Sequence, residues 1–216
     1  MDPLRLTIAA VPLAAYLLLL GLLNLRRQPL ITSGSRDLAA LGLALSGAML
    51  VGPLELFRPE AAVVEMGNYV WLLLLSFYWL WVWLFGLLAR PRLVIYNISG
   101  EELHPVLAEV ASELDSNARW AGDSLTMPKL GVQLHLDSFS IMRNVSLASS
   151  GGHQSLDGWH CLATLMAKKL SVIRVQPNPR AISFFAAAAV LIALSFTQLL
   201  SRPLELAEAI REVWKY

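Results

Sequence analysis

The sequence predicts an integral membrane α-helical protein, with four transmembrane helices and a small cytoplasmic α+β domain inserted between the third and fourth helices. Composition is the first reason. Hydrophobic residues make up 56% of the 216 residues and charged residues only 15%, whereas ordinary soluble domains carry roughly 25% charged residues. The second reason is that four separate stretches are long and apolar enough to cross a hydrocarbon core, which requires about 20 helical residues.

The four spans are expected at about residues 6–25, 38–57, 69–89 and 181–200, so that residues 1–92 hold the first three and residues 177–202 hold the fourth. A cleaved signal peptide would carry its positive charge before the apolar run. Here Arg26 and Arg27 follow the first run. We therefore expect an uncleaved first helix.

Basic residues predict the orientation, because cytoplasmic loops are enriched in Lys and Arg. They gather after the first span, after the third and before the fourth: Arg26, Arg27, Arg36, Arg90, Arg92, Lys168, Lys169, Arg174 and Arg180. The link between the second and third spans carries only Arg58, beside Glu60 and Glu65. We expect a multi-pass protein of the cell membrane with both termini outside and residues 93–176 in the cytoplasm.

Residues 93–176 alternate between strand and helix patterns in the order β-α-β-β-α, with room for one further short strand. An apolar strand at residues 93–97 precedes Ser99 and Glu102, which form a capping-box pattern at a helix start. Val132, Leu134 and Leu136 alternate with polar residues, as in a half-buried strand. Two helices covering one face of an antiparallel sheet would bury both amphipathic faces.

The remaining parts of the domain are less regular. Gly122 and Asp123 have the composition of a turn between short extended pieces around Trp120 and residues 125–127. Residues 141–147 favour a strand, and helical spacing returns from Leu156. Residues 203–216 predict an amphipathic helix at the outer membrane interface; packing of this tail on the loop between the second and third spans is the alternative.

The third span holds the candidate ligand-binding residues Tyr78, Trp79, Trp81 and Trp83. We expect these large rings to pack against small residues of the second and fourth spans: Gly42, Ser46, Gly47 and Ala186 to Ala189. The alternative is that they form the wall of a ligand-binding site. Glu55 is a further candidate, since an acid inside a span is a functional hypothesis by default. Its place near the outer end and near Arg58 also fits a boundary acid.

The segment 151–161 holds the densest polar cluster, with His153, Asp157, His160 and Cys161. These residue types bind metals, but their spacing matches no zinc pattern. His160 and Cys161 are adjacent and would point about 100° apart on a helix. We therefore expect no metal site, no catalytic site and no cofactor. Since Cys161 is the only cysteine, no disulfide can form within the chain.

Two functional hypotheses follow. The first is a non-enzymatic accessory or scaffold protein that docks a partner through its cytoplasmic domain. The second is a membrane-embedded binding protein for a lipid, quinone or other apolar ligand that uses the tryptophan-rich span; a membrane enzyme that uses residues 153–161 ranks third. The expected partners are the lipid bilayer and other membrane or cytoplasmic proteins or a second copy of the chain. Nucleic acid is not expected, because the formal net charge is only +1.

Overall fold

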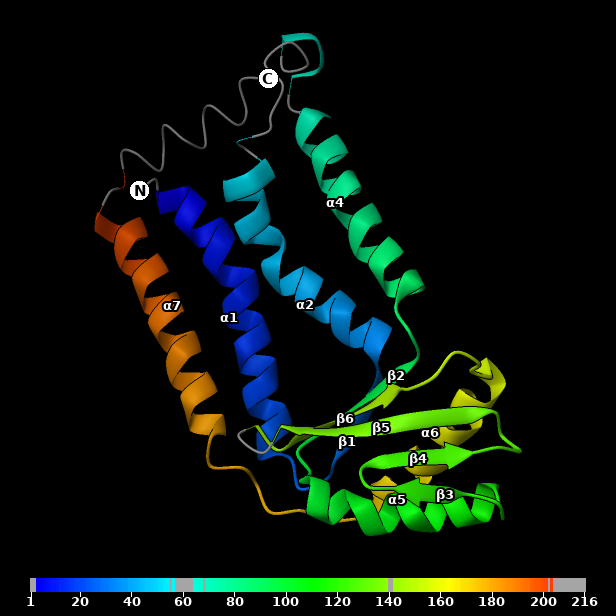
Figure 1. Ribbon diagram of the computed structural model, residues 1–216. Helices are drawn as coiled ribbons and strands as arrows, with labels where there is room; N and C mark the ends of the chain where they lie inside the picture. Colours follow the sequence, from blue (N-terminus) through cyan, green and yellow to red (C-terminus); the bar gives the residue numbers. More distant parts are fainter. Residues whose placement is uncertain are drawn as a thin grey trace. The chain divides into compact units, whose positions relative to one another are not determined.

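The computed structural model describes residues 3–54, 56, 64–67, 69–139, 142–201 and 203. The chain forms two compact units (Figure 1). The first unit comprises Met1–Gly21, Leu38–Leu87 and Ile182–Tyr216, and the second comprises Leu22–Asp37 and Leu88–Ala181. The second unit therefore includes the segment that connects the first two predicted spans.

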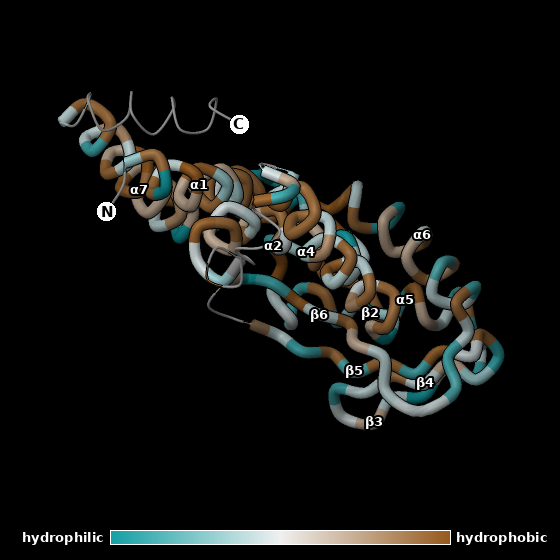
Figure 2. The backbone as a smooth tube through the Cα atoms, turned by 90° about the horizontal axis from the view of Figure 1, so that it is seen from above, coloured by the Kyte–Doolittle hydropathy of each residue, from teal (hydrophilic) through white to brown (hydrophobic). Residues whose placement is uncertain are grey.

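Helices make up the described part of the first unit. They are α1 (Pro3–Leu25), α2 (Gly34–Met49), a π-helical turn (Leu50–Leu54), α4 (Tyr69–Leu88) and α7 (Ala181–Ser201). Of these, α1, α4 and α7 are long and apolar enough to cross a membrane. Figure 2 shows the largely hydrophobic colouring of α1 and α7. Helix formation at these three predicted spans is confirmed.

The second predicted span differs in form. Helix α2 begins at Gly34, about one turn before the expected start, and changes from α to π geometry at Leu50. Pro53 lies in the π turn. A proline has no N–H to donate and its ring clashes with the preceding turn, which explains the loss of α geometry there. The expected end of this span and the tail from residue 204 to 216 lie outside the described residues.

The helices of the first unit approach one another at small residues. A Cβ atom on Gly47 would lie 1.9 Å from the carbonyl oxygen of Ile8 in α1. The ring of Phe185 in α7 lies against Gly21, where a Cβ would be 2.9 Å from it. Close backbone approach at glycine and alanine is the usual geometry of helices that pack in a membrane.

The second unit contains a six-stranded antiparallel sheet in the order β1-β2-β6-β5-β4-β3 (Figure 1). The strands are β1 (Leu30–Ser33), β2 (Arg92–Tyr96), β3 (Arg119–Ala121), β4 (Ser124–Met127), β5 (Val132–Phe139) and β6 (Asn144–Ser149). Two helices, α5 (Gly100–Leu114) and α6 (Leu156–Val172), complete the unit. The expected turn at Gly122 and Asp123 joins β3 to β4, with Gly122 at a φ of 59°.

Both helices pack on the same face of the sheet, as expected. Alternate residues of the strands enter one core with the apolar faces of α5 and α6, and the fully buried members include Ile95, Leu103, Leu125, Leu134, Leu147, Leu162 and Met166. The predicted capping box is confirmed, because Glu102 N–H donates to Ser99 Oγ and Ser99 N–H donates to the Glu102 carboxylate.

The sheet has more strands than the sequence patterns predict. Four strands, not two or three, lie between α5 and α6, because the short pieces around Trp120 and residues 125–127 pair as a hairpin beside β5. The other addition is β1, which comes from the connection between α1 and α2 and pairs with β2. Its register places Leu30 opposite Tyr96 and Thr32 opposite Val94.

Candidate functional site

The aromatic residues of α4 divide into one buried ring and several exposed ones. Tyr78 is 8% exposed, and its hydroxyl donates a 2.6 Å hydrogen bond to the carbonyl of Gly42 in α2. Trp81 and Trp83 are 46% and 70% exposed, and Trp79 is half-buried beside Tyr78. Tyr78 is therefore a ring that packs on the small residue Gly42 of α2.

The exposed rings of α4 form a continuous row. Phe77 and Trp81 meet edge to face with centroids 6.1 Å apart, and Trp81 and Phe85 lie 5.7 Å apart. The three rings are spaced i, i+4 and therefore lie on one side of the helix. About half of each ring is exposed, at 53% for Phe77, 46% for Trp81 and 58% for Phe85.

The polar segment around residues 153–161 does not form a cluster. His153, Asp157, His160 and Cys161 are all exposed. Within the described ranges, no three His, Cys, Asp or Glu side chains lie where they could hold a metal ion. Glu55, the candidate intramembrane acid, lies outside the described residues.

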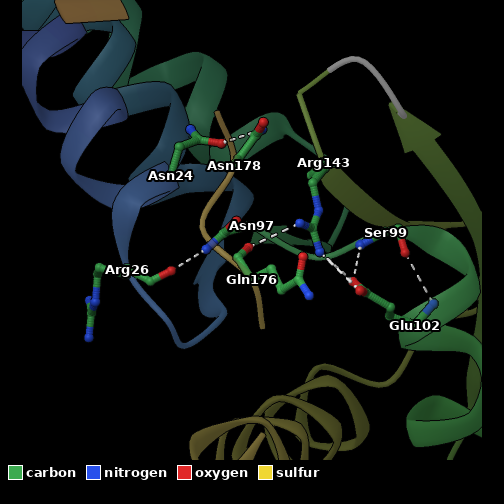
Figure 3. Close-up of polar contacts among 8 residues, drawn as sticks. All are labelled: Asn24, Arg26, Asn97, Ser99, Glu102, Arg143, Gln176 and Asn178. Atoms are coloured by element: carbon green, nitrogen blue, oxygen red, sulfur yellow. Dashed lines mark hydrogen bonds and ion pairs between the residues drawn. The ribbon is translucent and has the colours of Figure 1, made fainter. Parts of the chain in front are cut away.

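A polar junction in the second unit joins the end of α1 to the segment before α7 (Figure 3). Asn24 and Asn178 are linked by a side-chain hydrogen bond of 3.0 Å, and Asn178 N–H also donates to the carbonyl of Asn24. One turn further along, Val175 N–H donates to the carbonyl of Arg27. These bonds align the two segments that lead into and out of the unit.

Asn97 extends the polar junction to the end of β2. Its side chain is fully buried, and Nδ2 donates to the carbonyl of Arg26 at 2.5 Å (Figure 3). Asn97 has a φ of 61°, a conformation that asparagine adopts more readily than most residues. Its burial and this hydrogen bond give Asn97 a structural role at the junction.

Arg143 links the start of α5 to the segment before α7. Its guanidinium donates to both carboxylate oxygens of Glu102, at 3.0 and 2.8 Å, and to the carbonyl of Gln176 at 3.0 Å (Figure 3). Burial raises the pKa of Glu102, but the hydrogen bonds from Ser99 and Arg143 outweigh it and hold the pKa of this carboxyl below its ordinary value.

A groove of about 510 Å³ lies at the start of α5. We call it the acidic groove. Its walls are the first turn of α5, the turn between β3 and β4, and the end of the β5–β6 hairpin, and its polar and aromatic lining includes Ser99, Glu101, His104, Asp123, Ser138 and Phe139. Its volume is within the usual range of ligand pockets, about 300–1,000 Å³.

The position of α5 explains the groove. Gly100 lies so close to β5 that an added Cβ would be 3.0 Å from Cβ of Ser138. Because α5 begins at Gly100, it does not cover the last residues of β5, and Phe139 is 60% exposed. At the rim, the ring of His104 stacks on Trp120 with centroids 4.4 Å apart.

A second polar array lies on the sheet face opposite the helices. Ser124 Oγ is 3.0 Å from Nδ1 of His135, its direct partner across the strands, and Nε2 of His135 is 3.5 Å from Asp137. In a hydrolase triad the carboxylate contacts Nδ1 and the serine contacts Nε2. The order here is reversed, the Asp137 contact is long, and both side chains are about half exposed. This array has the features of a solvated cross-strand ladder.

Neither the acidic groove nor the polar junction was predicted from the sequence. The groove combines residues from three separate elements, so only the tertiary structure brings them together. For the junction, one indication is present in the sequence, because the polar residue Asn24 lies in the last turn of an otherwise apolar run.

No protein-family model, no curated protein and no solved structure matched this chain.

Proposed function

We propose that this chain is a four-span membrane protein whose second unit lies on the cytoplasmic side and docks a partner protein, so that the chain serves as an accessory or scaffold component. The observation that carries the proposal is the pairing of β1 with β2. These strands come from two connections that are separated in the sequence by α2 and α4.

The pairing constrains the number of membrane crossings. Strands of one sheet lie on the same side of a membrane, because an unpaired backbone inside the hydrocarbon is too costly. If α4 crosses once, the chain between Ser33 and Tyr69 must cross once more to return. Among the described residues of that segment, α2 and its π-helical turn provide a long apolar helical stretch. The strand pairing therefore supports a second span even though α2 alone has only 16 residues.

Charge supports the cytoplasmic side. All the arginines and lysines that predicted the orientation belong to the second unit, which holds residues 22–37 and 88–181. By the positive-inside rule this unit faces the cytoplasm. With α1 and α7 crossing away from it, both chain termini lie outside.

The second unit also suits a docking role. It includes the ends of all four helices, namely the last residues of α1, the first of α2, the last of α4 and the first of α7. Its helices cover one face of the sheet, and the other face presents polar side chains such as His135 and Asp137. A domain held by several helix ends offers a partner a preorganised surface, which lowers the entropic cost of binding.

The exposed aromatic row of α4 favours a second candidate function, binding of an apolar ligand within the membrane. Phe77, Trp81 and Phe85 present a continuous aromatic surface, and Trp83 is exposed on nearly the opposite side of the helix. A quinone or a lipid chain would suit such a surface. The two functions make different predictions for purified material, since docking requires a bound protein and binding requires a bound small molecule.

Two measurements test the proposal. The first uses Cys161, the only cysteine and an exposed one, as a label for sidedness. A membrane-impermeant maleimide should react with Cys161 only after cells are permeabilised. A Cys161→Ser chain carrying Glu65→Cys, an exposed position between α2 and α4, should react in intact cells. Equal labelling of both positions in intact cells would refute the four-span topology.

The second measurement is mass spectrometry of the chain purified in mild detergent. A second protein that co-purifies with the chain at a fixed molar ratio supports docking. A retained small molecule without a protein overturns docking in favour of the ligand-binding alternative, and loss of that molecule from a Trp81→Ala, Trp83→Ala chain would locate it on α4.

A further inference from the structure

We propose that the acidic groove binds a lysine or arginine side chain from a basic segment of the partner protein. This inference rests on the docking function above and identifies where the partner is held and by which chemistry. Its basis is an imbalance of charge in the second unit, together with the shape and lining of the groove.

Most carboxylates of the second unit have partners. Asp37 pairs with Arg92, Glu102 with Arg143, Glu109 and Glu113 with Lys169, Asp115 accepts backbone N–H groups, and Asp137 lies near His135. Among the described residues of the unit, only Glu101, Asp123 and Asp157 make no ion pair or hydrogen bond through the carboxylate. Two of these three line the acidic groove.

The groove contains no balancing cation. No lysine or arginine is among its lining residues, and the nearby Arg143 is already engaged by Glu102 and Gln176. The start of α5 contributes a partial positive charge of about +0.5. This is smaller than the two full negative charges of Glu101 and Asp123, so the groove attracts cations.

The lining fits an extended cation better than a bare metal ion. In the part of the chain that the structure describes, Glu101, His104 and Asp123 do not converge as metal ligands. Lysine and arginine instead carry a long apolar stem behind the charge. The exposed ring of Phe139 offers an apolar contact for that stem, and an aromatic face also attracts a cation directly.

The same charge distribution selects among possible occupants. Anionic lipid headgroups and phosphorylated segments would be repelled by the two carboxylates. A free polyamine carries similar ammonium groups, but it lacks the peptide backbone and the adjacent side chains that could contact the walls of the groove. A basic protein segment satisfies both the charge and the apolar lining, and it is the occupant to which the proposal commits.

The test uses the full chain in nanodiscs of neutral phosphatidylcholine and two fluorescent probe peptides. One is acetyl-Gly-Leu-Arg-Leu-Gly-amide, and the other has glutamine in place of arginine. We expect the arginine peptide to bind at low ionic strength and the glutamine peptide to bind at least about tenfold more weakly. Spermidine should compete only weakly. Equal binding of the two peptides, or binding of spermidine in preference to the arginine peptide, would overturn the proposal.

Substitutions then locate the site. Glu101→Gln with Asp123→Asn should weaken binding of the arginine peptide about tenfold or more, since it removes both charges without removing backbone bonds. Asp157→Asn is the matched control, because Asp157 is also an exposed, unpaired acid but lies on α6 outside the groove. It should change binding less than about twofold. Equal loss in the two variants would exclude the groove.

The outcome also separates this inference from the docking function. A co-purifying protein that stays bound to the Glu101→Gln, Asp123→Asn chain would leave docking intact and refute the groove as its site. Absence of any protein from the unsubstituted chain would refute docking itself. Circular dichroism of the double variant serves as the check that the sheet is retained.

Discussion

Asn178 donates its side-chain amide to Oδ1 of Asn24 at 3.0 Å, although 154 residues separate them in the sequence. Both side chains are almost fully buried, at 3% and 1% exposure. Asn178 Oδ1 also accepts the N–H of Arg180 at 3.1 Å, just before α7 begins. One residue thus joins the end of α1 to the turn that leads into α7.

Replacement of Asn178 should therefore destabilise the second unit. Asn178→Ala removes two hydrogen bonds, and a net contribution of about 1 kcal/mol for each predicts a loss of about 2 kcal/mol in the free energy of unfolding. Thermal unfolding in detergent measures the change. Gln176→Ala is the control, since the Gln176 side chain is exposed and only its backbone carbonyl is engaged. Equal stability of the two variants would contradict the role given to Asn178.

The pairing of β1 with β2 predicts a specific disulfide. Thr32 and Val94 are direct partners across antiparallel strands, where Cα atoms lie about 4.5–5.5 Å apart, within the range that a disulfide spans. In a Cys161→Ser background, Thr32→Cys with Val94→Cys should form a disulfide rapidly under mild oxidation. The shift in mobility on a non-reducing gel reports it.

An offset pair provides the control for that register. Leu30 lies opposite Tyr96, so Leu30→Cys with Val94→Cys is a diagonal pair with Cα atoms about 7–8 Å apart. It should form a disulfide far more slowly. Comparable rates for the two pairs would mean that β1 does not hold this register.

The contact between α1 and α2 predicts a strong difference between two glycines. Gly47→Ala places a methyl group 1.9 Å from the Ile8 carbonyl oxygen, so the helices must separate. Overpacking of this kind costs about 1–3 kcal/mol. Gly52→Ala is the matched control, because a Cβ there meets nothing within 4 Å. Thermal stability in detergent should fall for Gly47→Ala only, and an equal fall for both would refute the close contact.

Local patterns in the sequence were sufficient for the helices but not for the whole sheet. The apolar runs of α1, α4 and α7 and the capping box of α5 involve residues close in the chain, so periodicity and spacing identify them. Strand β1 has only four residues, Leu30–Ser33, and its partner β2 follows two further helices. Nothing in those four residues specifies a partner so distant, and the strand was missed.

The candidate sites likewise depend on tertiary contacts that local sequence does not specify. Trp79, Trp81 and Trp83 are candidates because three tryptophans lie within five residues, yet the ring that packs on Gly42 is Tyr78. Glu101, His104 and Asp123 are unremarkable singly, and they line one groove because α5 starts against β5. Local composition identifies residue types that are suited to binding, whereas only tertiary contacts bring such side chains from different elements together at one site.

Tyr78→Phe tests the packing of α4 on α2. The substitution removes one buried hydrogen bond to Gly42 and keeps the ring. Hydrogen bonds between membrane helices contribute about 0.6 kcal/mol on average and at most about 1.7, so we expect a loss within that range. Trp83→Phe should be neutral by comparison, because Trp83 is 70% exposed. Thermal unfolding that shows a larger loss for Trp83→Phe would reverse the assignment of the packed ring.

Asp115 predicts the acid sensitivity of the second unit. It is 1% exposed, and its carboxylate accepts backbone N–H bonds from Asn117 at 2.8 Å and Lys129 at 2.7 Å. Burial raises the pKa of Asp115, but these hydrogen bonds outweigh it and lower the pKa below the ordinary value. A carboxyl with a lowered folded-state pKa stabilises the fold above its unfolded pKa, and this contribution is lost as the pH falls through the folded value.

The fold should therefore lose stability as the pH drops below about 4, the ordinary range for aspartate. Asp115→Asn removes this titration, and it also sets an amide nitrogen against backbone donors. We expect the variant to be less stable at pH 7 and to show a shallower loss of stability between pH 5 and pH 3. Asp157→Asn, an exposed acid on α6, is the control and should keep the original slope. Thermal unfolding across this pH range measures both, and an unchanged slope in Asp115→Asn would show that Asp115 does not control the acid response.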